Sequence, residues 1–229
     1  MENTSFGGIQ VSKRKSLREE VYDSLRKSIL HGKLKAGQRL IEEQLAHQIG
    51  ISRTPVREAF HKLEKDDLVI RLPKGGFAVR EFTKADVEEI FGIRCALESY
   101  AAYLATLHIT PDKISVLEKK MEELQKALEG GDTNKVVQLN TEFHNLLYKA
   151  CKSKKLADMI NNFSDYFYRY RAAFPINEDN FKYTVDDHRS MLEAMKKKNP
   201  RVVEKLVRTH LEKTKELVLQ AVDEGKMTP

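Results

Sequence analysis

The chain has 229 residues, of which 41% are hydrophobic, so it is long enough for two domains and apolar enough to bury a core. It contains no apolar run of about 18 residues, which predicts no membrane span. Its first residues lack the apolar segment of a secretory signal, and its only cysteines, Cys95 and Cys151, cannot build a disulfide framework. These features predict a cytoplasmic protein.

The positive charge of the chain is unevenly distributed. Residues 1–80 contain 16 Lys+Arg and 10 Asp+Glu, whereas the remainder contains 24 of each, so the whole net charge of +6 lies in the first third. A basic module on a neutral body indicates a polyanionic partner for that module. The alternative interpretation is a chance imbalance on a solvated surface.

Three helices are predicted in the first third, behind a flexible tail at residues 1–15. Apolar residues at three- and four-residue spacing predict a first helix that starts near Ser16 and ends at His31-Gly32. A second helix is expected at about 41–49. Ser52 can cap a third helix, which extends to about Asp66.

Two short β-prone segments follow these helices, at 68–72 and 77–80. The residues between them include two glycines, which allow the positive φ angles of a tight hairpin. Two helices joined by a glycine-containing turn and followed by a β-ribbon are typical of a winged helix-turn-helix. We therefore expect residues 16–80 to form a DNA-binding domain of this kind.

The second helix of such a pair places its N-terminal end in the major groove. Here that end carries Arg53 and Arg57, which lie four residues apart on one helix face and can each donate two hydrogen bonds to a guanine edge. Ser52 and Thr54 can bind phosphate oxygens. The alternatives are that Arg53 pairs with Glu58 or another nearby acidic residue on a solvated face, or that the module binds only protein.

The tip of the predicted hairpin is the second candidate contact with DNA. It can lie along the phosphate backbone as a wing, through Lys74, Gly75 and Gly76. Together, the basic charge, the two arginines and this tip indicate binding to double-stranded operator DNA.

Residues 17–80 resemble the DNA-binding domain of GntR-type regulators. The segments that carry the resemblance are Ile29–Gly37, Leu45-Ala46, Ile51–Ala59 and Leu63-Glu64. It implies that Arg53, Thr54, Arg57 and the wing glycine contact DNA. The chain departs from the family at Asp67, where glycine is usual. Because aspartate tolerates left-handed backbone better than most residues, we expect a small cost and no change of fold.

The remainder, residues 81–229, is predicted to be entirely helical. Thr83 followed by Asp86 is a helix-start signal, and the linker between the domains is expected near residues 81–83. Further helices are expected at about 110–130, 132–149, 155–174, 181–197 and 200–224. The fold class is thus mainly α, with an N-terminal winged helix-turn-helix and a C-terminal antiparallel bundle of about six helices.

Three histidines, His144, His188 and His210, lie on apolar stripes of three different predicted helices, so they can converge in one bundle. Imidazoles suit zinc, nickel or related divalent metals. Asn140 lies four residues before His144, hence on the same helix face, and can add an oxygen ligand. The alternative is that these histidines are hydrogen-bonded core residues.

Arg94 is a charged residue on an apolar stripe, where a charge is costly unless it is paired. Its guanidinium matches the geometry of a carboxylate, so it can clamp a carboxylate effector. The other interpretation is an ion pair with Glu98, four residues along the same helix.

Residues 84–222 resemble the FCD-type effector domain that follows one branch of GntR heads, the FadR-type branch. The resemblance is carried by Ile93–Glu98 with Ala101-Ala102, Asn140–His144, His188–Ala194 and His210-Leu211. It implies a divalent metal bound by Asn140, His144, His188 and His210, and a homodimer. Many members have aspartate at the first position, so the neutral oxygen of Asn140 predicts a different affinity or metal choice.

The sequence thus predicts a transcriptional regulator whose operator affinity is set by a small carboxylate effector at a metal in the helical domain. The rivals are a direct metal sensor, a metal-free binding domain with structural histidines, and a metal-dependent enzyme with a DNA-targeting head. The enzyme is disfavoured because no carboxylate base occupies a matching position. Glu142 is two residues from His144 and points away from it on a helix.

Overall fold

A computed structural model describes residues 15–81, 83–173 and 178–224, so the predicted tail lies almost entirely outside the described residues. The chain divides into two compact units, residues 1–81 and 82–229.

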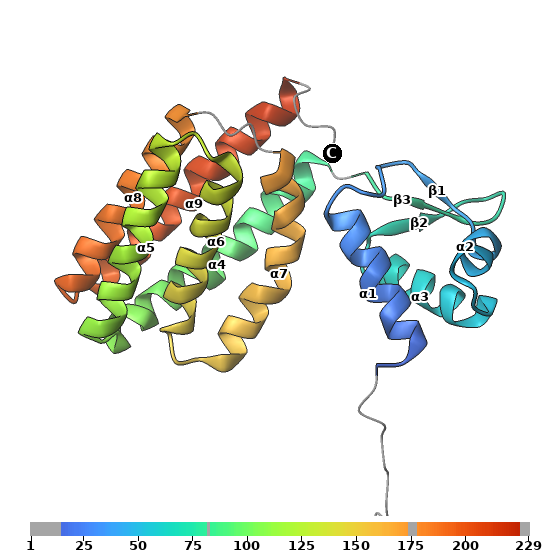
Figure 1. Cartoon of the computed structure of the whole chain (residues 1–229), viewed down its shortest axis with the longest axis horizontal. Coiled ribbons are helices and arrows are strands. Elements are labelled where there is room, and N and C mark those ends of the chain that lie inside the picture. Colours follow the sequence, from blue (N-terminus) through green and yellow to red (C-terminus); the bar gives the residue numbers. More distant parts are fainter. Residues whose placement is uncertain (1–14, 82, 174–177, 225–229) are drawn as a thin grey trace, which may run out of the picture. The chain divides into compact units, whose positions relative to one another are not determined.

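The first unit combines three helices with a small sheet (Figure 1). Its elements in chain order are α1 (Leu17–Leu30), β1 (Arg39–Leu40), α2 (Glu42–Ile49), α3 (Arg53–Lys65), β2 (Val69–Arg71) and β3 (Phe77–Val79). The predicted helix-turn-helix and the β-ribbon after it are therefore confirmed.

Local sequence signals explain where α1 begins and where α2 ends. Ser16 and Glu19 form a reciprocal capping box at the start of α1. Gly50 ends α2 in the left-handed conformation, with φ 71°. At α3 the expectation was only partly right: Ser52 occupies the N-cap position, but its side chain makes no capping hydrogen bond.

The sheet contains a strand that the sequence did not predict. Its order is β1-β3-β2, antiparallel throughout, and β1 pairs Arg39 with Ala78 and Leu40 with Phe77. Because β1 has only two residues, it is too short for a period-two pattern to be visible. Its pairing depends on residues almost forty positions away along the chain.

The core of this unit is formed where α3 meets α1 and the sheet. The inner face of α3 buries Val56, Ala59, Phe60 and Leu63. The rings of Phe60 and Phe77 stack with centroids 5.0 Å apart, which fixes α3 against β3. Just beyond α3, Asp67 adopts φ 55°, the left-handed conformation considered for this position.

The second unit is a bundle of six helices within the described residues (Figure 1). They are α4 (Lys84–His108), α5 (Pro111–Glu129), α6 (Thr133–Lys149), α7 (Lys154–Ala173), α8 (Glu178–Lys196) and α9 (Pro200–Asp223). The capping pair expected from the sequence is present, with Thr83 and Asp86 starting α4, and the Asn199 side chain caps the start of α9. The all-helical prediction for this part is confirmed.

Helix α4 packs along α9 and also contacts α6 and α7, while α5 packs against α6 and α8. The two cysteines are buried free thiols, and burial raises the pKa of the Cys95 thiol. Both therefore serve as small apolar core residues. None of the described helices is long and apolar enough to cross a membrane.

Candidate DNA-binding surface and histidine site

The start of α3 presents the predicted contact residues to solvent. Ser52, Arg53, Thr54 and Arg57 are all exposed, while Val56 between them is buried. The structure pairs Glu58 with Arg18, at 3.7 Å, and not with Arg53. Within the described residues, Arg53 and Arg57 make no ion pair or hydrogen bond, so both guanidinium groups are available to a ligand.

The electrostatics at this helix start also favour an anion. The first turns of α1 and α2 each contain two glutamates, which offset the positive end of the helix dipole. The first turn of α3 contains no acidic residue, and the Ser52 hydroxyl does not occupy its amides. The backbone N–H groups at the start of α3 can therefore bind a phosphate.

The hairpin tip is held by its own glycines and by β1. Gly75 and Gly76 have φ angles of 83° and 82°, and residues with a side chain rarely adopt such angles. A Cβ atom on Gly76 would lie 2.9 Å from the Leu40 carbonyl oxygen. Arg39 donates a hydrogen bond of 3.1 Å from Nη2 to the Gly75 carbonyl, and Lys74 is exposed at the tip. The tip is thus a defined turn that presents a cation.

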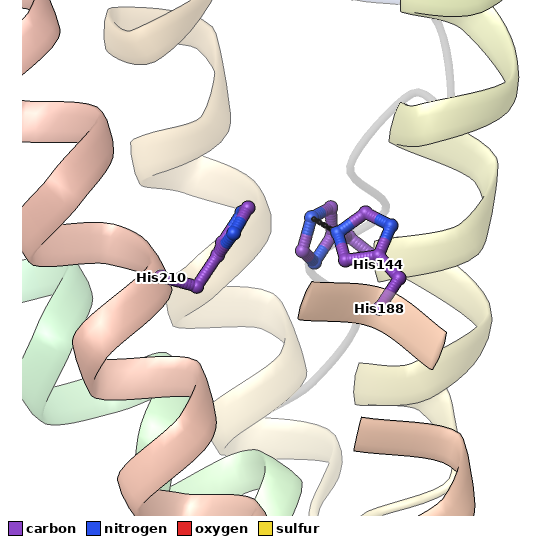
Figure 2. A group of neighbouring side chains, drawn as sticks. All are labelled: His144, His188 and His210. Carbon is purple, nitrogen blue, oxygen red and sulfur yellow. Dashed lines mark hydrogen bonds between the residues drawn. The ribbon is translucent and has the colours of Figure 1, made fainter. Parts of the chain in front are cut away.

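The three histidines of the bundle converge, as the sequence suggested they can (Figure 2). His144 comes from α6, His188 from α8 and His210 from α9, and all three are buried. One nitrogen from each ring lies within 4.8 Å of the others. The Nε2 atoms of His144 and His188 are 3.1 Å apart. The cluster can hold a metal ion.

Two of these rings are oriented by hydrogen bonds on their outer nitrogens. His210 Nδ1 lies 3.1 Å from Asp187 Oδ2 and donates to that carboxylate, which leaves Nε2 as the acceptor nitrogen. Burial alone would raise the pKa of Asp187. The hydrogen bond from His210, together with the nearby Lys213, outweighs burial and lowers that pKa instead. His144 Nδ1 lies 3.1 Å from the Tyr148 hydroxyl, and that hydroxyl donates to Glu98.

Arg94 forms the ion pair that was one of its two interpretations. Its Nε and Nη2 donate to the two carboxylate oxygens of Glu98, at 2.6 and 3.2 Å, and both side chains are more than 90% buried. The guanidinium also lies over the Phe91 ring, with its central carbon 5.2 Å from the centroid. The Glu98 carboxylate therefore already binds the Nε–Nη2 edge of the Arg94 guanidinium in this structure.

The donor set suits a divalent cation of the zinc or nickel type. Two nitrogens bound to one zinc at about 2.0–2.1 Å in a tetrahedral arrangement lie about 3.3 Å apart, close to the observed 3.1 Å. Asn140 lies one turn before His144 on α6. Its Oδ1 atom is buried and has no hydrogen-bond partner among the described residues, so it is a candidate oxygen ligand.

Three functional neighbours were missed from the sequence. Tyr148 lies four residues after His144, so helical spacing alone could have placed it on the same face. Asp187 is 23 positions from the His210 that it contacts, and Arg39 is 36 positions from Gly75. Those two contacts depend on tertiary packing, and no local pattern signals them.

An open basic helix start beside a defined wing, followed by a helical unit with a buried polar site, defines a winged helix-turn-helix regulator with a ligand-binding unit. Comparison with known proteins agrees: residues 17–79 match the bacterial regulatory proteins of the gntR family, and residues 89–213 match the FCD domain. The chain belongs to the GntR family of bacterial DNA-binding transcriptional regulators and carries an FCD effector domain.

Individual relatives support this assignment along most of the chain. The chain is 32% identical over 208 residues to the uncharacterized HTH-type transcriptional regulator YdhC of Bacillus subtilis, covering 90% of this chain and 93% of that one. It is 33% identical over 192 residues to the regulator McbR of Escherichia coli, covering 82% and 86%. These relatives are transcriptional regulators, so the chain is a regulator and not an enzyme.

Solved structures show the same fold. The E. coli McbR/YncC structure superposes with a TM-score of 0.70 at 28% identity, covering 91% of this chain and all of that one. A GntR regulator from Rhodococcus sp. RHA1 superposes with a TM-score of 0.67 at 22% identity, covering 90% and 99%.

Proposed function

We propose that this regulator binds a near-palindromic operator as a homodimer, and that a small carboxylate effector acting at a metal in the helical unit controls the binding. The convergence of His144, His188 and His210 is the observation that carries the proposal, since three buried imidazoles from three helices form a set that a metal can join. Zinc or nickel fits such ligands.

The charge of the site explains the choice of effector. Three neutral imidazoles and the Asn140 amide add no negative charge, so a bound divalent cation would keep its charge and attract an anionic oxygen to any open position. Other residues of the chain preorganise the site. Asp187 orients the His210 ring through a hydrogen bond. The bundle core excludes bulk water from His188, whose exposed fraction is 0%.

The DNA-binding side of the proposal rests on the exposed start of α3 and on the wing. Arg53 and Arg57 would read base edges in the major groove, while Ser52, Thr54 and the amides at the helix start bind phosphate. Lys74, Gly75 and Gly76 would follow the backbone. One such module makes a small contact, and a dimer doubles it on a two-fold operator.

The outer face of α4 is the surface that we assign to the second copy of the chain. Tyr100 and Leu107 are 52% and 50% exposed on this face, and Tyr103 stacks on Tyr100 with centroids 6.3 Å apart. Exposed aromatic and aliphatic side chains at helical spacing are typical of an interface core. In a two-fold dimer the same surface of both subunits meets, so the occupant of this face would be a second α4.

The Arg94–Glu98 pair favours a second candidate, in which the metal itself is the effector. Glu98 occupies the Nε–Nη2 edge of Arg94, so an external carboxylate would have to bind through the other guanidinium edge or displace Glu98, and separating a buried bidentate pair is costly. A direct metal sensor needs no such exchange. The two candidates differ in whether an organic acid adds anything to the effect of the metal.

Metal content and thermal stability test this proposal. We expect the purified wild-type chain to bind about one divalent ion per subunit and to be stabilised by it, by about 2.7 kcal/mol at a free metal concentration one hundred times Kd. His188→Gln should abolish both effects. His108→Gln, at an exposed histidine outside the cluster, is the matched control and should behave as wild type.

A panel of small organic acids then separates the two candidates. An acid that raises the melting temperature of the metal-loaded wild type, but not of the metal-free protein or of His188→Gln, supports the carboxylate effector. Stabilisation by metal with no response to any acid supports the direct metal sensor. Equal metal binding by His188→Gln and wild type would rule out the histidine site.

A further inference from the structure

The environment of His144 extends beyond the cluster to a buried chain of polar side chains. We propose that Tyr148, held by Glu98, is a positioning residue that fixes His144 with its proton on Nδ1, so that the Nε2 lone pair faces His188 and His210. The proposal deepens the metal site of the proposed function, and its effect on metal affinity rests on that site.

The direction of the hydrogen bonds follows from the donors and acceptors present. Glu98 already accepts from Arg94 through both carboxylate oxygens, and a carboxylate accepts but does not donate. The Tyr148 hydroxyl therefore gives its only hydrogen to Glu98. Its oxygen remains as an acceptor, 3.1 Å from His144 Nδ1, so this nitrogen must carry the hydrogen.

Burial stabilises the hydrogen bonds that join Glu98, Tyr148 and His144. The exposed fractions of Glu98, Tyr148 and His144 are 4%, 5% and 6%, so bulk water cannot compete for these groups. The rings of His144 and Tyr148 also stack, at 27° with centroids 5.7 Å apart, which limits rotation of the imidazole. Ring orientation and proton position are thus both set from the side opposite the cluster.

The chain of contacts links two helices. His144 and Tyr148 lie on α6, whereas Glu98 and Arg94 lie on α4, the helix that begins at Lys84, just after the boundary between the two units. Any change in the orientation of the His144 ring alters its contact with the Tyr148 hydroxyl, and through that hydroxyl the hydrogen bond to Glu98. A change at the cluster can therefore reach α4 through the Tyr148–Glu98 hydrogen bond, in addition to the direct packing of α4 against α6 and α9.

Two isosteric variants test the positioning role, in the full chain without metal. With imidazole-labelled protein, nitrogen NMR should show the Nδ1–H form of His144 in wild type, its signals being assigned by their loss in His144→Gln. In Glu98→Gln the amide can donate to Tyr148, whose hydroxyl then donates to His144, so we expect the Nε2–H form. Tyr148→Phe should give a mixture of the two forms.

Zinc affinity, measured by competition with a chelator, gives the second readout. Tyr148→Phe and Glu98→Gln should each raise the Kd for zinc by about 10–100-fold, and the double variant should be no worse than Tyr148→Phe alone because both act through one contact. Thr106→Val removes a buried side-chain hydrogen bond elsewhere on α4 and should change the Kd by less than about threefold.

An Nε2–H form of His144 in the wild-type chain would overturn the positioning role. So would unchanged zinc affinity in Tyr148→Phe when melting shows that the variant is folded. If the wild type bound no zinc, the metal proposal would fail, while the NMR measurement would still decide whether Tyr148 and Glu98 set the His144 proton.

Discussion

Truncation of Glu98 to alanine should destabilise the protein by about 3–5 kcal/mol, one of the two largest effects that we expect. The variant leaves the Arg94 guanidinium in the core of the helical unit without the carboxylate that holds it at 2.6 and 3.2 Å. It also removes the acceptor of the Tyr148 hydroxyl. Unfolding in urea, followed by circular dichroism, measures the loss.

Two further variants separate the buried pair from charge in general. Glu193→Ala removes a carboxylate that is paired with Lys196 at 2.7 Å but is 53% exposed, and it should leave the free energy of unfolding nearly unchanged because solvent screens the pair. Replacing Arg94 and Glu98 together by methionine should recover much of the loss, because no charge is then left buried alone. A Glu98→Ala loss below about 1 kcal/mol would contradict the geometry described.

The second large effect concerns DNA. Arg57→Ala should weaken operator binding by about 1–3 kcal/mol and relax the preference for one base pair, because a bidentate contact with a guanine edge is lost. Arg57 is exposed on the first turns of α3, beside Arg53 and opposite the buried face. Selection of binding sites from random DNA, followed by titration of the enriched sequence, measures both affinity and preference.

The control for this prediction lies at the other end of the same helix. Lys65 is an exposed basic residue at the last position of α3, and Lys65→Ala should leave the selected sequence unchanged. Wild type should enrich two half-sites whose centres lie about 10 base pairs, or a multiple, apart. If Arg57→Ala enriched the same sequence with the same affinity, the start of α3 would not be the reading surface.

Much of the fold was predictable because its signals are local. Gly50 ends α2, and the glycines at 75 and 76 shape the wing, because glycine readily adopts positive φ angles. The Thr83–Asp86 pair starts α4 through reciprocal capping hydrogen bonds. Each signal involves only one or two residues. Strand β1 was not predictable in this way. It forms only because Phe77 and Ala78 offer it a partner across the sheet.

The site shows the same division between local and long-range information. The sequence placed three histidines on apolar helix faces, but their meeting to within 4.8 Å is a result of packing. For Arg94 two partners could be named, and the structure contains the near one, Glu98. The role of Asp187 could not be predicted from the sequence because its contact with His210 joins two different helices.

If the histidine site controls DNA binding, metal and acid should change the affinity of the chain for its selected DNA. This affinity is measured for wild type and for His188→Gln, each without metal, with metal, and with metal plus the organic acid found by thermal shift. We predict at least about a fivefold change in Kd for wild type and none for the variant. An equal change in both proteins, or no change in wild type with either acid or metal, would contradict the account.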